Sequence, residues 1–350
     1  MKLGMILLFG VCAVSLVSAQ NKTAAPNAGP ASSDASGMLQ LTATARIPLV
    51  GMLVGKGRCD DQGDIYVRFM DADMNRMHHG KSKIPIEKID PEGRPAATFH
   101  VTDAFADIWG KDFFVSGEGE VYQAGFMPDG AVYVVEFDKG GSLKSKTRVE
   151  STGFTPYQIT VFESGGFLLS GTTGISNGRR PFTGVFDARG KLIKEIYEPE
   201  DEDSRRRAEV GEPGFAPDYT NSGNTLVWRG DAALGSDGNA YLLRAASPAL
   251  VYVISPKGEV VRKLRIDPPD AGLIAESIKA APGKLAVSFL NRGMITGMIK
   301  VVDLQGALIA NYSSDNVRTP GLPGCYIASG FVYLDDDPDH NLYLRRAEPK

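Results

Sequence analysis

The sequence predicts an all-β fold, a six-bladed β-propeller closed by an N-terminal strand, and three observations predict it. Glycine supplies 40 of the 350 residues, well above the roughly 7% of average proteins, so the chain turns often. Short runs that alternate apolar and polar residues recur, whereas the helical period is nearly absent. A turn motif also returns at a nearly constant spacing, as it does in repeat proteins.

Residues 1–19 predict a secretory signal peptide. Met1-Lys2 form a short basic segment, residues 3–17 are apolar, and small residues end the run at Ala19. The apolar run is too short for a comfortable membrane span, and a buried N-terminal helix is the alternative. Without Lys2 the chain has 37 basic and 42 acidic residues, a net charge of −5 (38 − 1 − 42). We therefore expect an exported protein, periplasmic or extracellular, with no membrane span and no nucleic-acid partner.

Residues 20–37 predict a disordered linker. They are mostly Asn, Ala, Pro, Ser and Gly, and they bury too little apolar surface to offset the entropy of ordering. The expected domain layout is a signal peptide at 1–19, a linker at 20–37 and a propeller at 38–350.

Five turns of one kind divide the propeller. Each has Asp or Ser, two further residues and Gly, between strand-like stretches such as 131–137 and 192–197. The side-chain oxygen can accept a backbone hydrogen bond, and Gly can take the positive φ of a tight hairpin. The turns are Asp90-Pro91-Glu92-Gly93, Asp138-Lys139-Gly140-Gly141, Asp187-Ala188-Arg189-Gly190, Ser255-Pro256-Lys257-Gly258 and Asp303-Leu304-Gln305-Gly306. Their spacings of 48, 49, 68 and 48 residues give a period near 48 with one insertion.

A second motif, interleaved with the first, begins another strand in each unit. Its six occurrences are Gly63-Asp64-Ile65-Tyr66, Gly119-Glu120-Val121-Tyr122, Gly165-Gly166-Phe167-Leu168, Gly238-Asn239-Ala240-Tyr241, Gly283-Lys284-Leu285-Ala286 and His340-Asn341-Leu342-Tyr343. Each follows a weaker strand, such as 158–162 or 330–334, so one unit holds four short strands. Repeated four-stranded sheets are propeller blades, because each sheet must stack on its neighbours to cover both faces.

Two of these segments resemble a known family. Asp60-Asp61-Gln62-Gly63-Asp64-Ile65-Tyr66-Val67 and Ser236-Asp237-Gly238-Asn239-Ala240-Tyr241 resemble the core of NHL repeats, and the blade count resembles six-bladed propellers of the NHL and TolB-like kind. The resemblance covers about residues 39–350, although the motifs at Phe167 and Leu285 lack the tyrosine. It implies a fold but no single activity, because the superfamily contains enzymes, binding partners and scaffolds.

The period also predicts how the ring closes. Adding 48 to Asp303 gives 351, one past the last residue, so the sixth hairpin turn and its outer strand are missing from the C-terminus. Residues 39–50 are strand-like and fit as the outer strand of the last blade, where they would hide an unpaired edge. Cys59 and Cys325 then lie in the first and last blades. We predict a disulfide between them, with two separate buried thiols as the alternative.

The expected binding face is the loop face, which carries the loops that leave the second strand of each blade and the loops that connect blades. Its long or polar loops are 71–83, 172–181, 198–225 and 291–297. A ring of guanidinium groups there could hold a carboxylate or a sulfated sugar, and solvated side chains are the alternative. The candidates are Arg68, Arg179, Arg180, Arg244, Arg292 and Arg345, with Arg68 and Arg345 at matching places in blades one and six.

The sequence contains no recognisable catalytic motif. Ser170 lacks the leading glycine of a nucleophile elbow, and no phosphate-binding or dinucleotide-binding loop follows a strand. The charged block at 198–207 predicts a solvated loop rather than a calcium site. His78-His79 does not supply the three or four converging ligands that zinc needs. We therefore predict no catalytic residue, no metal site and no cofactor.

Two functions remain possible. The first is a non-catalytic exported binding module or scaffold, expected as a monomer, whose loop face or central channel binds a protein or an anionic glycan. The second is a metal-dependent propeller lactonase or lyase, which would need carboxylates and amides at matching inner-strand positions. We take those positions to run from Tyr66 in the first blade to Tyr343 in the last, and they contain no acid. The sequence favours the binding module.

Overall fold

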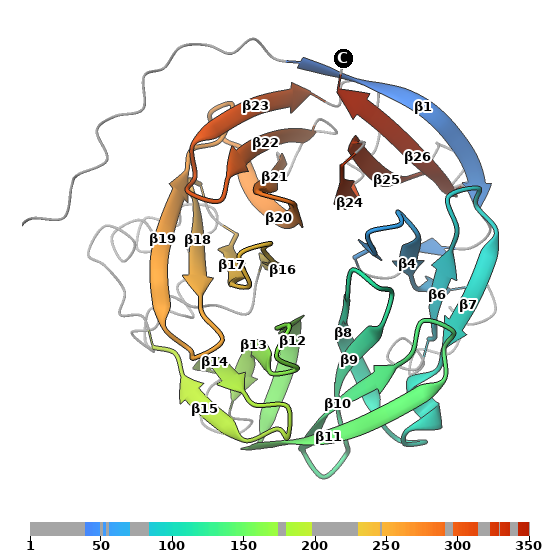
Figure 1. The fold of residues 1–350 in the computed structure, drawn as a ribbon, viewed down its shortest axis with the longest axis vertical. Coiled ribbons are helices and arrows are strands. Elements are labelled where there is room, and N and C mark those ends of the chain that lie inside the picture. Colours follow the sequence, from blue (N-terminus) through green and yellow to red (C-terminus); the bar gives the residue numbers. More distant parts are fainter. Residues whose placement is uncertain are drawn as a thin grey trace, which may run out of the picture. The chain divides into compact units, whose positions relative to one another are not determined.

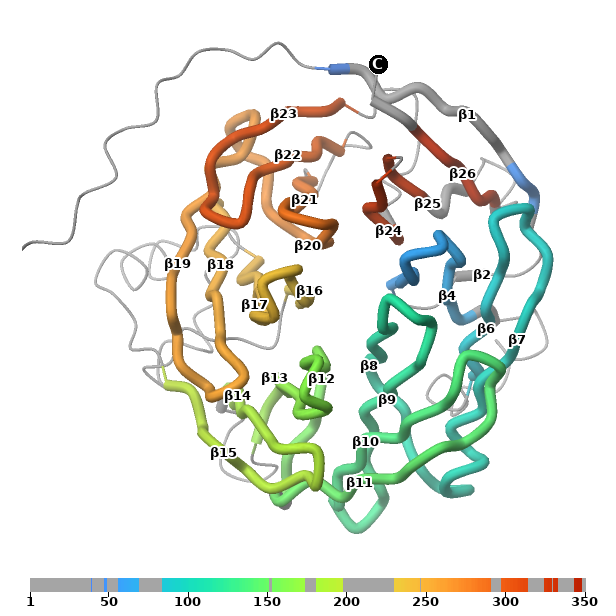
Figure 2. Tube along the Cα trace, viewed as in Figure 1, coloured from blue at the N-terminus to red at the C-terminus, as the bar shows by residue number. Residues whose placement is uncertain are grey.

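A computed structural model describes residues 39–49, 52–53, 56–70, 84–173, 180–197, 230–245, 247–290, 297–313, 323–328, 330–336 and 342–349. These residues belong to one unit, Ser36–Lys350, and form a ring of antiparallel sheets (Figure 1). Each blade has its first strand at the centre of the ring and its last strand at the rim (Figure 2). The predicted all-β propeller is therefore confirmed. The predicted signal peptide and linker lie outside the described residues.

The first three blades each follow the order of the chain from centre to rim. Blade 1 contains β3 (Arg58–Cys59), β4 (Ile65–Val67), β6 (Ile86–Ile89) and β7 (Pro95–Phe99). Blade 2 contains β8 (Trp109–Val115), β9 (Val121–Phe126), β10 (Ala131–Phe137) and β11 (Leu143–Thr152). Blade 3 contains β12 (Phe154–Val161), β13 (Phe167–Thr173), β14 (Arg180–Phe186) and β15 (Leu192–Glu195).

The last three blades include one that both ends of the propeller build together. Blade 4 contains β16 (Gly230–Leu234), β17 (Ala240–Arg244), β18 (Ala249–Ile254) and β19 (Val260–Ile266). Blade 5 contains β20 (Ile274–Ala281), β21 (Lys284–Leu290), β22 (Gly297–Asp303) and β23 (Leu308–Ser313). Blade 6 contains β24 (Pro323–Ile327), β25 (Gly330–Asp336), β26 (Leu342–Pro349) and, at the rim, β1 (Leu39–Leu49). Two short strands, β2 (Met52–Leu53) and β5 (Phe69–Met70), pair separately, and a 3₁₀ turn, η2 (Val101–Asp103), links blades 1 and 2.

The ring closes as predicted, through the N-terminal strand. β1 pairs antiparallel with β26 from Leu41 to Leu49, and its first two residues pair parallel with β23 of blade 5. β1 therefore covers the rim edge of blade 6 and also joins the two neighbouring blades. An open edge at this seam would be a template for pairing with other chains, so the arrangement protects the fold.

The last occurrence of the second motif differs in position from the other five. Leu342 and Tyr343 begin a strand, as expected, but this strand is β26, the third strand of blade 6, whereas the motif begins the second strand in the other blades. The reason is that the N-terminus supplies only one strand, so the C-terminal segment must supply the other three. The motif there has His340 and Asn341 in place of the glycine pattern, and its likeness to the other five motifs was misleading.

Glycines of the five predicted turns lie where neighbouring blades meet at the rim. Gly141 and Gly190 have φ of +94° and +81°, as the turn requires. A Cβ added to Gly141 would lie 2.3 Å from the carbonyl oxygen of Thr98 in β7, and one added to Gly190 would lie 2.0 Å from that of Arg148 in β11. The glycine is therefore needed both for the turn and for close approach to the previous blade.

The hydrophobic core is divided among the seams between blades. Six clusters of buried residues are found in the described chain, and each draws on two adjacent blades. The cluster between blades 1 and 2 contains Phe99, Phe113 and Phe137, and the cluster between blades 6 and 1 contains Ile65, Val332 and Leu344. Each sheet is thus covered on both faces by its neighbours, which explains the near-continuous apolar character of the second strands.

The NHL-like segments form a link between a turn and the strand that follows it. Asp60 Oδ1 accepts the backbone N–H groups of Gln62 and Asp64, at 3.1 and 3.0 Å, and its Oδ2 accepts the Tyr66 hydroxyl at 2.9 Å. In blade 4 the Tyr241 hydroxyl donates in the same way to Asp237 at 2.9 Å. These residues shape the hairpin between the first and second strands.

In the part of the chain that the structure describes, no helix is long and apolar enough to span a membrane.

Candidate functional site

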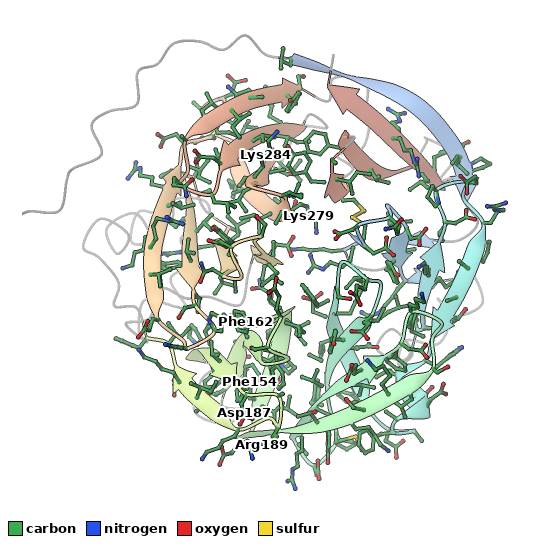
Figure 3. The ribbon with its side chains drawn as sticks, viewed as in Figure 1. Phe154, Phe162, Asp187, Arg189, Lys279 and Lys284 are labelled. Atoms are coloured by element: carbon green, nitrogen blue, oxygen red, sulfur yellow. A yellow bond between two sulfur atoms is a disulfide. The ribbon has the colours of Figure 1, made fainter. Side chains whose placement is uncertain are left out.

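Charged side chains from the inner strands of four blades meet near the centre of the ring. They are Arg58 on β3, Asp112 on β8, Asp231 on β16 and Lys279 on β20, with Lys56 just before β3. We call these five residues the central charge cluster. Figure 3 shows Lys279 extending from blade 5 toward the middle of the ring.

Asp231 is the completely buried anion of this cluster. Its Oδ1 accepts the Arg58 guanidinium at 2.8 Å and the backbone N–H of Ala232 at 3.0 Å. Its Oδ2 accepts Lys279 Nζ at 3.2 Å, and Lys56 Nζ lies 3.6 Å from Oδ1. Burial alone would raise the pKa of this carboxyl, but Arg58 and the two lysines hold the pKa well below its usual range. Asp231 is therefore ionised.

Arg58 connects three blades through one guanidinium group. Its Nη1 bonds Asp231 in blade 4, its Nη2 bonds Asp112 Oδ2 in blade 2 at 3.2 Å, and its Nε donates to the Phe113 carbonyl at 3.2 Å. Burial would lower the pKa of Arg58, but the two carboxylates raise it overall. The Arg58 side chain is 9% exposed, so these bonds are shielded from water and stronger than surface ion pairs.

β-bulges in the inner strands place the acceptors and donors of the cluster. The strand register shifts between Gly110 and Phe113 in β8, between Pro156 and Gln158 in β12, and between Ala275 and Ser277 in β20. A bulge redirects nearby side chains and backbone groups, and Asp112 lies within the first one.

Backbone N–H groups just after the other two bulges donate hydrogen bonds to the two carboxylates of the cluster. The N–H of Ile159 in blade 3 donates to Asp112 Oδ2 at 3.2 Å. The N–H of Ile278 in blade 5 donates to Asp231 Oδ2 at 3.4 Å. Each aspartate is thus attached to the blade that follows its own, and the cluster fastens five inner strands to one another.

Lys279 is a buried amine beside other cations. Its Nζ donates to Asp231 and also to the carbonyl of Gly57 at 3.3 Å. Burial, followed by the positive charge of Arg58, lowers the pKa of Lys279 to about 7, against the opposing effect of Asp231. The lysine therefore changes its charge near neutral pH.

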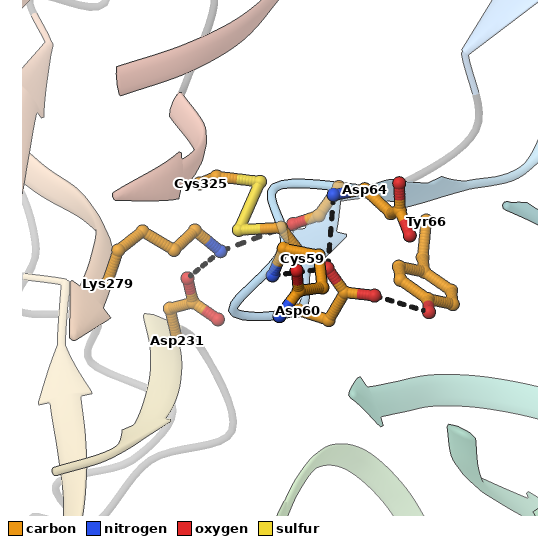
Figure 4. Close-up of a disulfide and its surroundings, with 9 residues drawn as sticks. Cys59, Asp60, Asp64, Tyr66, Asp231, Lys279 and Cys325 are labelled. Atoms are coloured by element: carbon orange, nitrogen blue, oxygen red, sulfur yellow. Dashed lines mark hydrogen bonds and ion pairs between the residues drawn. A yellow bond between two sulfur atoms is a disulfide. The ribbon is translucent and has the colours of Figure 1, made fainter. Parts of the chain in front are cut away.

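A disulfide attaches the same segment to the last blade (Figure 4). Cys59, next to Arg58, is bonded to Cys325 on β24, with a Cα–Cα distance of 5.5 Å and a sequence separation of 266 residues. The predicted disulfide is therefore confirmed. β3 is held on one side by the disulfide, on the other by the central charge cluster, and by the Asp60–Tyr66 bond that follows it.

Arg68 is a predicted site residue that the structure places beside this cluster, against residues 111–113. It follows β4 and is 8% exposed, and its Nη1 donates to the Lys111 carbonyl at 2.6 Å. Its guanidinium carbon lies 5.2 Å from the centre of the Phe113 ring. Arg58 and Arg68 thus both bind the short segment 111–113 of β8. Burial lowers the pKa of Arg68 to about 10, with a small opposing effect of Asp112, so the side chain stays charged at neutral pH.

The described residues place Arg244 and Arg345 relative to Arg68, and the expected ring of arginines stays a prediction. Arg244 ends β17 in blade 4 and lies three residues after Tyr241, whereas Arg68 lies two residues after Tyr66. Because side chains alternate between the two faces of a sheet, Arg68 is on the same face as Tyr66, but Arg244 is on the opposite face from Tyr241. Arg345 lies on β26, a third strand, so the expected match between Arg68 and Arg345 is wrong. Arg180 begins β14. Arg179, Arg292 and the side chain of Arg180 lie outside the described residues.

The central charge cluster was missed because the wrong strand was searched. The positions compared in the sequence, from Tyr66 to Tyr343, belong mostly to second strands, whereas the innermost strands carry Arg58, Asp112, Asp231 and Lys279. One local signal was present, because Asp231 is the single charge among the small and apolar residues of Gly230–Leu234. Among the described residues, no group of three or more His, Cys, Asp or Glu side chains is placed to hold a metal ion.

No protein-family model matches the chain, and no curated protein matches it. Solved structures resemble it at low identity. They include a protein of unknown function from Bacteroides caccae (12% identity, TM-score 0.45, covering 74% of this chain and 81% of that chain) and the PQQ-bound form of an aldose sugar dehydrogenase from Streptomyces coelicolor (12%, TM-score 0.45, 88% and 98%). BBS1N in complex with ARL6DN is similar at 11% identity (TM-score 0.43, 89% and 97%). Likenesses this weak carry no argument about function, and the fold rests on the strand pairing of this chain.

Proposed function

We propose that the protein is an exported, non-catalytic binding module that takes an anionic ligand, such as an acidic glycan, at the loop-face end of its central channel. The observation that carries the proposal is an excess of basic over acidic side chains near the centre of the ring. Lys56, which is partly exposed, Arg58, Arg68 and Lys279, which is only partly charged near pH 7, face the carboxylates of Asp112 and Asp231. Buried cations without equal numbers of anions are costly unless a partner compensates them.

The position of these groups also favours a ligand on the loop face. Lys56 precedes the inner strand β3, and Arg68 follows the second strand β4, which runs antiparallel to it. Both therefore lie at the end of blade 1 where second strands finish. Lys56 is the most accessible cation of the cluster, with 31% of its side chain exposed. It can meet an incoming anion before the more buried groups do.

Export is supported by the chemistry of the cysteines. The Cys59–Cys325 disulfide joins the first and last blades, and structural disulfides persist mainly in oxidising compartments. The predicted signal peptide at 1–19 agrees with this location. We infer a periplasmic or extracellular protein.

The proposal is tested by measuring binding of an oligouronate and of a neutral oligosaccharide of equal length by calorimetry. We expect the acidic ligand to bind more tightly, with an affinity that falls as salt increases. Lys56→Glu should weaken binding at least tenfold. Lys284→Glu is the matched control, because Lys284 is exposed at the start of β21, on the opposite face. Equal affinity for the acidic and neutral ligands would contradict the proposal.

A further inference from the structure

Trp109 is the one exposed large apolar side chain on the inner strands that the structure describes. Among the described residues, the other exposed large apolar side chains belong to the outermost strands or directly follow one; they are Leu39, Leu143, Ile193, Tyr197, Val261, Leu308 and Ile309. Trp109 instead begins β8, the innermost strand of blade 2, and is 45% exposed. Tryptophan is enriched at binding interfaces because its ring offers a large apolar surface. Its place near the centre of the ring therefore indicates a contact surface.

The indole of Trp109 lies at the loop face, toward the seam between blades 2 and 3. Trp109 pairs with Phe126 at the end of β9, where second strands finish. The two rings make an edge-on contact, with 5.2 Å between their centres. Phe126 in turn packs against the apolar cluster that blades 2 and 3 share. This contact fixes the indole while nearly half of the residue stays open to solvent.

The ammonium group of a lysine lies over the same phenylalanine ring. Lys111 follows Trp109 by two residues, within the bulge of β8. Its Nζ lies 5.2 Å from the centre of the Phe126 ring and 5.9 Å from the centre of the Tyr157 ring, on β12 of blade 3. Aromatic faces attract an ammonium group and leave it charged. The two rings therefore hold a partly exposed cation beside the indole.

This pair of side chains is continuous with the central charge cluster. Asp112, the residue after Lys111, accepts Arg58 Nη2 and the Ile159 N–H, each at 3.2 Å. The negative charge of Asp112 is thus offset within the cluster. Trp109 and Lys111 lie on the same strand and at the loop face, so they lie where the proposed function places its ligand.

An indole beside an ammonium group favours an acidic sugar. The indole offers a flat apolar surface for the C–H face of a sugar ring, and the ammonium can bind a carboxylate. A neutral sugar would make no use of Lys111, and a small carboxylate would make no use of Trp109. A protein partner would need a wider apolar surface, because a standard interface buries about 800 Å² on each side.

We propose that Trp109 and Lys111 form a subsite for one acidic sugar ring at the loop face, between blades 2 and 3. The sugar ring packs on the indole, and its carboxylate accepts a hydrogen bond from Lys111 Nζ. The rings of Phe126 and Tyr157 keep Lys111 in place. This inference rests on the proposed function and deepens it, because it assigns residues that recognise one ring of the ligand. Binding is reversible and non-covalent.

Tryptophan fluorescence locates the bound sugar. The chain has two tryptophans, Trp109 and Trp228, so Trp228→Phe leaves Trp109 as the only source of the signal. This protein, with its disulfide intact, is titrated with glucuronate, glucose and acetate. We expect a saturable change with glucuronate, a change with glucose only at concentrations at least fivefold higher, and no change with acetate.

Two substitutions, followed by calorimetry, separate the roles of the indole and the ammonium. Trp109→Ala removes the stacking surface and should weaken glucuronate binding at least tenfold. Lys111→Met removes the charge and should reduce glucuronate binding to the level of glucose. Tyr197→Ala is the first control, since it removes a 57% exposed ring at the rim. Lys146→Met is the second, since it removes an ammonium 4.6 Å from the centre of the Phe105 ring on rim strand β11. Both controls should bind as the original protein does.

Each result supports or overturns the subsite. If Trp109→Ala binds glucuronate as tightly as the original protein, the subsite is wrong. If Lys111→Met still prefers glucuronate to glucose, or the original protein never does, the role of Lys111 is wrong. Should Trp109→Ala fail to fold, Trp109→Phe keeps a smaller ring and should weaken glucuronate several-fold, and unchanged affinity would overturn the subsite.

Oligouronates separate this subsite from the proposed function. If they bind and respond to Lys56→Glu but not to Trp109→Ala, the proposed function stands and the subsite fails. If no oligouronate binds, both fail. Loss of affinity in both variants supports both.

Discussion

At the scale of single residues, Asp231 organises the centre of the molecule. It is fully buried and holds Arg58, Lys279 and Lys56 with one carboxylate. A buried ion-pair cluster adds little net stability when it is complete, but removing one partner is strongly destabilising because a buried charge is left uncompensated. The residue with the most charged partners should therefore be the most sensitive to substitution.

Asp231→Asn should destabilise the protein by about 3–5 kcal/mol, because the neutral amide leaves buried cations without their anion. The measurement is the free energy of unfolding from urea titration. The control is Arg94→Ala, which breaks an ion pair with Asp90. The Arg94 side chain is 72% exposed, so this substitution should not move the urea midpoint measurably. Similar effects for the two substitutions would contradict the account of the cluster.

Lys279 should make the stability depend on pH above neutrality. Its pKa is lowered to about 7 in the folded protein, whereas an unfolded lysine titrates near 10.4. Between these values the unfolded state binds more protons, so the free energy of unfolding rises with pH. Arg58, Asp231 and Lys56 are the charged groups that face it.

Lys279→Met removes this titration, and the comparison of the two proteins isolates it. The original protein should gain on the order of 2–4 kcal/mol relative to the variant between pH 7 and pH 10. Urea unfolding at several pH values measures the difference. Parallel curves for the two proteins would mean that Lys279 keeps an ordinary pKa.

At the scale of secondary-structure elements, the short first strands depend on side-chain links rather than on length. β3 has only two residues, too few to pair stably by backbone bonds alone. Its position comes from Arg58, from the disulfide at Cys59 and from Asp60, which accepts the Tyr66 hydroxyl. The tyrosine of the NHL-like motif thus has a structural role in this blade.

Tyr66→Phe should lower the free energy of unfolding by about 1–3 kcal/mol, because it leaves a buried carboxylate with one fewer donor. Tyr133→Phe is the matched control, since the Tyr133 ring packs on Phe105 at 4.5 Å and its hydroxyl makes no hydrogen bond to the described residues. It should change the free energy by less than about 0.5 kcal/mol. An equal loss in both variants would show that the hydroxyl bond to Asp60 contributes nothing.

The elements were largely predictable and the site was not. The five Asp-x-x-Gly or Ser-x-x-Gly turns fixed the outer hairpins, and 131–137 matches β10 residue for residue. They succeed because turn chemistry and strand alternation are local. The cluster depends on contacts between distant parts of the sequence, such as the bond from Lys279 to the Gly57 carbonyl, 222 positions away. The bulges in β8, β12 and β20 also shift which residues face the centre, and no local pattern reveals that shift.

At the scale of the whole molecule, three kinds of contact hold the ring closed at different radii. β1 closes it at the rim, an apolar cluster fills the seam between blades 6 and 1, and the disulfide joins the first and last blades near the centre. Because the first two remain without the disulfide, its loss should weaken the ring without abolishing the fold.

The double variant Cys59→Ser/Cys325→Ser should be less stable by about 2–5 kcal/mol, since the disulfide restricts the unfolded chain over a long loop. Urea unfolding of this variant, and of the original protein with and without a reducing agent, measures the effect. The variant and the reduced protein should agree. No difference between the oxidised and reduced proteins would contradict the pairing of Cys59 with Cys325.

The most direct test of the account is calorimetry of an oligouronate with the original protein, Lys56→Glu and Lys284→Glu. We predict saturable binding that Lys56→Glu weakens at least tenfold and that Lys284→Glu leaves unchanged, because only Lys56 lies at the loop-face end of the channel, in the central charge cluster. Equal binding by the three proteins, or no binding at all, would contradict it.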